Sequence, residues 1–264
     1  MAVPSFLDCA FRFTEIQITD VASIITTLRD ELVTQPAAAN KWTEPVSGTF
    51  KSPARSDGVF ITFATARISA TRIAYVVRDH NGLLVNNNSA DTRQDIGTGA
   101  TYVRIYSSPF YVIVDSANPT QNECWGTGIM DRAPEPLADP RPCYWSSSGP
   151  RNTTGDIFNN NWFYISTLAV GGTSYSVDTS GILTNTVNQT YSDMFTIEGT
   201  MLFVPLEFIS GIWLLGRMFN VLRTDMSQQS QAQFTVPLDD NVTGTFRILG
   251  WGYAYQNRLC CRVA

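Results

Sequence analysis

Apolar residues first recur along this chain with a helical period. Between residues 19 and 33 they are spaced three to four positions apart, which places them on one face of a helix. They are Val21, Ile24, Ile25, Leu28 and Leu32. Thr19 or Asp20 can cap the start, because a side-chain oxygen there accepts a free backbone N–H, and Pro36 ends the pattern. The spacing therefore predicts one amphipathic helix over residues 19–33.

Strand patterns begin after Trp42. Runs of β-branched and aromatic residues alternate with Gly, Asn, Asp and Ser, as is typical of strands joined by tight turns. The first runs are VFITFATARI, TRIAYVV, TYVRIY and FYVIVDS. Asn81 and Gly82 both tolerate positive φ, so the sequence DHNG predicts a two-residue hairpin. We expect residues 46–115 to form an antiparallel meander.

The amino-acid composition changes at residues 116–161, which are rich in Pro, Asn, Ser, Thr and Gly. We expect an ordered, packed connection there, and a domain boundary is the alternative. Strand patterns return over residues 162–264. Within them, Pro205 and Pro237 predict edge strands or bulges, because proline cannot donate a ladder hydrogen bond.

The predicted fold class is therefore mainly β, with antiparallel sheets in a sandwich-like or barrel-like arrangement and one N-terminal amphipathic helix. The chain divides into an N-terminal helix with its meander (1–115), the connection (116–161) and a C-terminal β region (162–264). These parts can also form one continuous domain.

Composition excludes some partners. Hydrophobic residues make up 44% of the chain and charged residues 16%, a balance typical of folded proteins. The net charge of −5 argues against direct binding of nucleic acid, which needs clustered cations. The 18 cationic residues are 16 arginines and two lysines. Protein interfaces favour arginine over lysine, but a genomic preference for arginine codons explains the same ratio, so both interpretations stay open.

The most apolar stretch, residues 201–222, predicts core strands. Pro205, Glu207 and Arg217 interrupt it, so it falls short of the roughly 20 apolar residues of a membrane span. The five cysteines are odd in number and scattered, and the first residues lack the pattern of a secretory signal. We expect free thiols and folding in a reducing cytoplasm.

Residues 124–145, CWGTGIMDRAPEPLADPRPCYW, concentrate the candidate chemistry. Asp131, Glu135 and Asp139 are four residues apart, which on a helix would align three carboxylates. The prolines among them prevent a helix, so this spacing gives no common face. We interpret the stretch as scaffolding.

The cysteines and the histidine support the same interpretation. Cys124 and Cys143 are nineteen residues apart and lack a chelating interval, and Cys260 and Cys261 would point to opposite faces of a strand. His80 is interpreted as an exposed turn residue, because no nucleophile motif accompanies it. We predict no catalytic residue, no metal and no cofactor.

Six large side chains are instead predicted to anchor packing or subunit interfaces. They are Trp125, Met130, Trp145, Trp162, Trp213 and Trp251. Aromatic residues in the stretches 159–164 and 250–257 leave a surface platform for a carbohydrate or receptor as an alternative.

Several segments resemble structural proteins of tailed bacteriophages. They are EGTMLFVPLEF, LLGRMFNVLRTD and FRILGWGYAYQNRLCCRVA near the C-terminus, and TDVASIITTLRDELV, KWTEPVSGTFKSP and YVRIYSSPFYVIVDS before them. The resemblance implies a non-enzymatic virion component of the neck or collar, tail or baseplate, assembled in the host cytoplasm. Its expected partners are copies of itself, in a symmetric homo-oligomer, and other virion proteins. A receptor- or glycan-binding module on a virion surface is the alternative, and a polysaccharide hydrolase is a further one.

Overall fold

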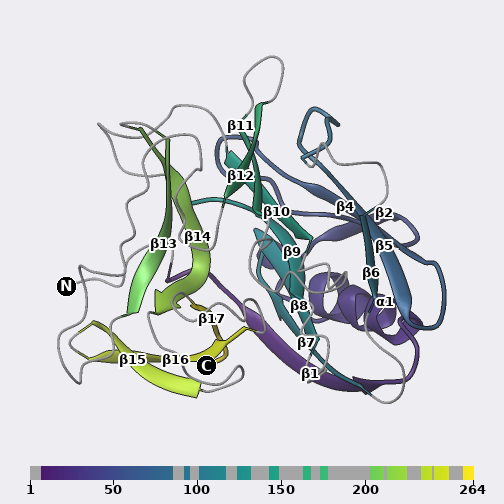
Figure 1. Cartoon of the computed structure of the whole chain (residues 1–264), viewed down its shortest axis with the longest axis horizontal. Helices are drawn as coiled ribbons and strands as arrows, with labels where there is room; N and C mark the ends of the chain where they lie inside the picture. The colour runs from purple at the N-terminus through teal and green to yellow at the C-terminus, as the bar shows by residue number, and fades with distance from the viewer. Residues whose placement is uncertain are drawn as a thin grey trace, which may run out of the picture.

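Three antiparallel β-sheets and one N-terminal helical segment make up the described part of the chain (Figure 1). The computed structural model describes residues 7–85, 92–95, 101–116, 124–131, 143–148, 163–167, 173–177, 203–210, 213–224, 233–239, 241–249 and 258–264. The sheets do not close into a barrel. The predicted fold class is therefore confirmed, with stacked sheets in place of a barrel.

The predicted helix is present. It comprises α1 (Ala22–Arg29) and continues directly into the π-helical turn η1 (Asp30–Thr34). The carboxylate of Asp20 accepts the backbone N–H of Ala22 at 2.8 Å, which supports the predicted cap. A short 3₁₀ turn, η2 (Ala38–Asn40), follows. Among the described residues, no helix is long and apolar enough to cross a membrane.

Each sheet is defined by its strand order. The N-terminal sheet contains, in chain order, β2 (Thr43–Val46), β3 (Thr49–Lys51), β4 (Thr62–Arg67), β5 (Arg72–Arg78) and β6 (Thr92–Asp95). The middle sheet contains β1 (Arg12–Ile18), β7 (Thr101–Ser107), β8 (Tyr111–Ser116), β9 (Cys124–Ile129), β10 (Cys143–Ser148), β11 (Phe163–Thr167) and β12 (Thr173–Val177). The C-terminal sheet has the order β13 (Phe203–Ser210), β14 (Trp213–Thr224), β17 (Arg258–Arg262), β16 (Val242–Ile248) and β15 (Gln233–Asp239).

Two sequence-based expectations about connectivity need correction. The meander predicted over residues 46–115 is split between two sheets, because β7 pairs with β1 and β8. The expected connection over residues 116–161 includes the strands β9 and β10, which pair with each other. Local patterns locate strands but do not specify partners, and here β1, from before the helix, forms the edge of the middle sheet beside β7.

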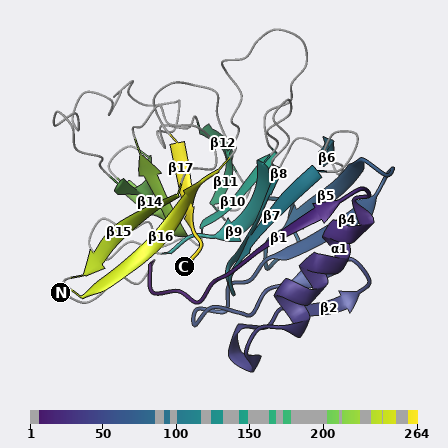
Figure 2. The ribbon, with the colours of Figure 1, turned by 90° about the horizontal axis from the view of Figure 1, so that it is seen from below.

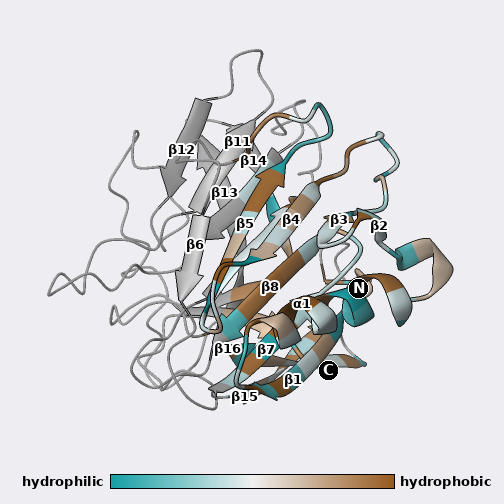
Figure 3. Cartoon of the chain, turned by 90° about the vertical axis from the view of Figure 1, so that its right-hand side faces the viewer, coloured by the Kyte–Doolittle hydropathy of each residue, from teal (hydrophilic) through white to brown (hydrophobic). Residues whose placement is uncertain are grey.

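The middle sheet separates two hydrophobic cores (Figures 1 and 2). Ile105 and Val112 belong to the helix-side core, which they share with α1 and the N-terminal sheet. Their neighbours Tyr106 and Ile113 belong to the C-terminal core, which they share with β14, β16 and β17. Because successive side chains point to opposite faces, the sheet is covered on both faces at β7 and β8, and residues 112–114 of β8 form a continuous apolar run, which gives this strand its hydrophobic colour in Figure 3.

Prolines lie on three outermost strands. Pro45 is in β2, Pro205 in β13 and Pro237 in β15, and each lies at or beside a register shift. Proline fits there because the outer edge of such a strand needs no N–H donor. The prediction that Pro205 and Pro237 mark edge strands or bulges is confirmed.

The turn after β5 has a different conformation from the predicted one. Asp79 donates its backbone N–H to Leu83, and Gly82 donates to Asp79. Gly82 has a φ of +81°, and it is the one residue of the turn with positive φ. The chain therefore turns through a longer loop than a two-residue hairpin, in which two residues would need positive φ.

Trp125 connects the middle sheet to the N-terminal sheet. Its ring stacks on Tyr75 with centroids 4.8 Å apart, and Phe63 lies 5.6 Å away. Its side chain is 1% exposed. This aromatic cluster fills the space between two sheets that share no backbone pairing in the described residues.

We predict that Trp125→Ala lowers the free energy of unfolding by about 3–5 kcal/mol, because it leaves a cavity between two sheets. Urea denaturation measures the change. Tyr102→Ala is the matched control, since Tyr102 is 50% exposed, and should have little effect. Equal losses in the two variants would contradict the role of Trp125.

A second prediction concerns pH. Hydrogen bonds from Arg67, and then from the N–H of Ala22, lower the pKa of Asp20 to about 2. Since this folded pKa lies below the usual 3.8, the carboxylate stabilises the fold above about pH 4 and loses this effect as the pH falls towards 2. The stability gap between wild type and Asp20→Asn, followed by urea denaturation, should be constant near neutral pH and should narrow between pH 4 and pH 2. Arg67→Gln should remove the same pH-dependent step, and a gap that does not change with pH would contradict the prediction.

Candidate functional site

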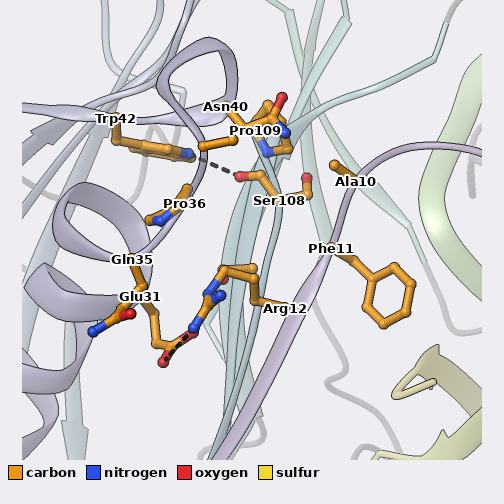
Figure 4. Close-up of a pocket in the computed structure, with 12 residues that line it drawn as sticks. Ala10, Phe11, Arg12, Glu31, Gln35, Pro36, Asn40, Trp42, Ser108 and Pro109 are labelled. Carbon is orange, nitrogen blue, oxygen red and sulfur yellow. Dashed lines mark hydrogen bonds and ion pairs between the residues drawn. The ribbon is translucent and has the colours of Figure 1, made fainter.

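A groove with a volume of about 200 Å³ opens between the start of β1, the segment that follows α1, and the β7–β8 turn (Figure 4). We call it the π-turn groove. Its lining residues are Ala10, Phe11, Arg12, Glu31, Gln35, Pro36, Ala37, Asn40, Trp42, Ser107, Ser108 and Pro109.

An ion pair between a buried carboxylate and a partly exposed arginine lies in this lining. Glu31 is 7% exposed, and Arg12 donates to it from Nε at 2.8 Å and from Nη2 at 3.4 Å (Figure 4). Thr14 donates its hydroxyl to the same carboxylate at 2.8 Å. The carboxylate is thus satisfied, as a buried charge must be, and the charges of Arg12 and Glu31 cancel within the groove.

The local backbone explains the position of Glu31. The residue lies in η1, where Gln35 donates its N–H to Asp30 five residues back. It also follows the buried Leu28 by three positions, on the apolar side of the helix. Such π-helical turns are rare and often mark functional sites. A carboxylate on an apolar helix face was the sequence signal for this groove.

Neighbouring contacts make the walls rigid. The indole N–H of Trp42 donates to the carbonyl of Ser108 at 2.8 Å, and the backbone N–H of Trp42 donates to Leu32. The hydroxyl of Ser108 accepts backbone N–H groups from Phe110 and Tyr111. The groove is therefore formed before any ligand binds.

Ser107 differs from these groups. It is 1% exposed and lines the groove, and its hydroxyl has no hydrogen-bond partner among the residues that the structure describes. An unpaired buried hydroxyl costs free energy, so its presence beside a cavity is informative. The sequence patterns did not predict a site at Arg12, Glu31 or Ser107. The contacts that distinguish these residues join distant parts of the chain.

The predicted anchors differ in what the structure describes. Trp125, Met130 and Trp145 are buried, Trp125 in the helix-side core and the other two in the C-terminal core. Trp213 begins β14, but its side chain lies outside the described residues, as do Trp162 and Trp251 entirely. Most residues of the alternative platforms, 159–164 and 250–257, also lie outside the described part.

The ends of the stretch 124–145 form the paired strands β9 and β10. Trp145 pairs directly with Gly128, whose other neighbour is Tyr111. A Cβ atom added at Gly128 would lie 2.5 Å from the indole nitrogen of Trp145 and 2.7 Å from Cβ of Tyr111. The glycine therefore makes room for two aromatic side chains, which is a packing role.

His80 is not an exposed turn residue, and that interpretation is wrong. It is half-buried, its Nδ1 forms a hydrogen bond with the hydroxyl of Tyr144, and the two rings stack with centroids 6.1 Å apart. Burial, and then the charge of Asp79, raises the pKa of Tyr144 well above its usual value. Tyr144 comes from the middle sheet, so the contact that buries His80 joins residues far apart in the sequence.

The described thiols are unreactive in character. Cys9, Cys260 and Cys261 carry thiols that are not joined in disulfides, as expected. Burial raises the pKa of Cys9 and that of Cys261 to about 12, so both remain protonated at neutral pH. Nothing is described of the side chains of Cys124 and Cys143.

The N-terminal segment is held by the C-terminal sheet. Asn220 of β14 has a φ of +55° and donates its side-chain N–H to the carbonyl of Cys9 at 3.0 Å. Arg262 of β17 donates to the carbonyl of Leu7 at 2.6 Å. These bonds fix the residues that lead into the groove wall at Phe11. The unfavourable backbone of Asn220 is thus offset by contacts that position this segment.

The carboxylates of the stretch 124–145 do not form a described cluster. The backbone of Asp131 pairs with that of Arg217, which joins the end of β9 to β14. Glu135 and Asp139 lie outside the described residues. Within the part of the chain that the structure describes, no three His, Cys, Asp or Glu residues are arranged to hold a metal ion.

Many arginines pair within the chain. The ion pairs join Arg12 to Glu31, Arg29 to Glu44, Arg55 to Asp57, Arg67 to Asp20, and both Arg104 and Arg247 to Glu15. Arg247 comes from β16, so its pair with Glu15 of β1 links the C-terminal sheet to the middle sheet. These arginines contribute to the fold, whatever role the others have at interfaces.

Comparison with known proteins does not assign the chain to a family. The chain matches no protein-family model, and no curated protein sequence is significantly similar to it. The functional argument therefore rests on the geometry of the described residues.

We predict that Arg12→Met destabilises the fold by about 1–3 kcal/mol, because it leaves the Glu31 carboxylate buried without its cation. The double variant Arg12→Met/Glu31→Met should recover most of this loss in urea denaturation. The matched control is Arg67→Met, whose partner Asp20 has a side chain that is 34% exposed against 8% for Glu31 and should tolerate the change better. A double variant as unstable as Arg12→Met would contradict the desolvation argument.

Proposed function

We propose that this protein is a non-enzymatic structural component of a phage particle, located in the neck or collar, tail or baseplate. It acts as a symmetric homo-oligomer that also contacts other virion proteins and assembles in the host cytoplasm. The sequence resemblance supports the class of particle. The prolines on three edge strands are the observation that carries the structural role.

The argument from the edges is physical. Subunits of a particle are held side by side at very high local concentration, and open strand edges then pair without control. Pro45, Pro205 and Pro237 weaken such pairing at three outer strands. Contacts between copies would then form through side-chain surfaces, which can be specific and can close around an axis.

The chemistry of the described residues supports this role over catalysis. The thiols of Cys9 and Cys261 are protonated, and the Glu31 carboxylate is paired with Arg12. Each of these groups is held in the form that stabilises a fold. A reactive centre built on these groups would require at least one of them to be activated.

The test has two measurements on the full chain. Light scattering after size-exclusion chromatography should give a closed oligomer whose mass does not increase with protein concentration, and mass spectrometry should find the chain in purified phage particles. Pro237→Thr should add larger or insoluble species, because it restores a pairing edge. Pro53→Thr, outside the described strands and outside the groove described above, is the control. A monomer that is missing from purified particles would overturn the proposal.

A further inference from the structure

We infer that the π-turn groove is a docking site for an extended segment of a neighbouring protein, which inserts an uncharged hydrogen-bonding side chain such as that of Asn, Gln, Ser or Thr. The inference rests on the proposed structural function, because the occupant is taken to be a protein of the same assembly. It adds a particular surface and a particular ligand chemistry to that function.

The size of the groove favours a side chain. At about 200 Å³ it is smaller than the roughly 300–1,000 Å³ typical of sites for drug-sized molecules and cofactors. One or two amino-acid side chains fit such a volume. The groove is only partly enclosed, so a chain carrying that side chain can run along it.

The charge of the groove favours an uncharged ligand. Arg12 and Glu31 are in direct contact and neutralise each other, and Thr14 completes the bonding of the carboxylate. An acidic ligand would have to compete with Glu31 for Arg12, and a basic one would have to compete with Arg12 for Glu31. A neutral polar group requires neither exchange and avoids the desolvation cost of a third charge.

Ser107 provides an unused hydrogen-bonding group at the floor. Its hydroxyl is buried without a partner in the described residues, and it is the direct cross-strand neighbour of Arg12. A polar side chain that reaches the floor would supply the missing bond. This bond takes the place of water at a hydroxyl that has no competing partner among the described residues, so it adds to the affinity for a polar side chain.

The rim suits an extended peptide. The carboxamides of Gln35 and Asn40 lie at opposite ends of the lining in Figure 4, and both belong to the groove. A carboxamide offers both a donor and an acceptor, as the backbone of an extended segment requires. Pro36 and Pro109 add rigid apolar surface between these ends.

The experiment uses a displayed library of random linear peptides, selected on the full-length protein. Enriched peptides are synthesised, and their affinities are measured by fluorescence anisotropy. We expect sequences that share an Asn, Gln, Ser or Thr, and we expect Ser107→Ala and Asn40→Ala each to weaken binding about five- to tenfold. Ser56→Ala and Asn81→Ala, exposed residues outside the groove, are the matched controls and should bind normally.

Folding and assembly are measured on the same variants. Ser107→Ala should keep or increase the wild-type stability, since it removes an unpaired buried hydroxyl, so a loss of binding cannot come from unfolding. The inference would be overturned if no peptides were enriched, or if wild type and both groove variants bound the peptides equally. It would also be overturned if the enriched peptides shared a charged residue, or if the groove bound glycans on an array in place of peptides. A monomeric chain missing from particles that still binds such peptides through the groove would support docking and overturn the structural function.

Discussion

The two-sided burial of the middle sheet is the constraint on which the rest of the structure depends. A sheet covered on both faces must fill two cores at once, so neighbouring residues of one strand serve different layers. On β9 and β10, Trp125 fills the helix-side core and Trp145 the C-terminal core. Gly128 makes this double burial possible, because only a residue without a side chain lets Trp145 and Tyr111 approach each other across the strand.

Polar groups between the layers follow from the same constraint. A charge buried in a covered sheet must find a partner, and the buried Arg104 does so with the exposed carboxylate of Glu15, which also binds Arg247 and so joins two sheets. Glu31 does so with Arg12 at the rim of the helix-side core. These ionisable groups between the layers are therefore paired with groups of opposite charge.

The edges and the groove together define how such a molecule can meet others. Three outer strands carry prolines, so contacts through backbone pairing are restricted at those edges. The π-turn groove offers a preformed surface of neutral charge, with the Ser107 hydroxyl at its floor. A stable scaffold with restricted edges and a small docking groove is consistent with a subunit whose function lies in its contacts.

Part of this structure follows from the sequence by itself. The helix, the strands in runs such as TRIAYVV and FYVIVDS, and the edge positions of Pro205 and Pro237 were predictable, because they depend on local rules, namely hydrophobic period and the missing N–H of proline. The strands β1, β9 and β10 were not predicted. The candidate site was less predictable from the sequence. A carboxylate at Glu31, on an apolar helix face, is a local signal, but no local pattern indicates that Arg12 is its partner.

Only the tertiary structure decided which strands pair, where the meander divides after β6, and that His80 is covered by Tyr144. The physical reason is that burial and pairing arise between residues far apart along the chain. Glu31 and Arg12 are separated by 19 residues, and His80 and Tyr144 by 64, and local periodicity carries no information on such distances.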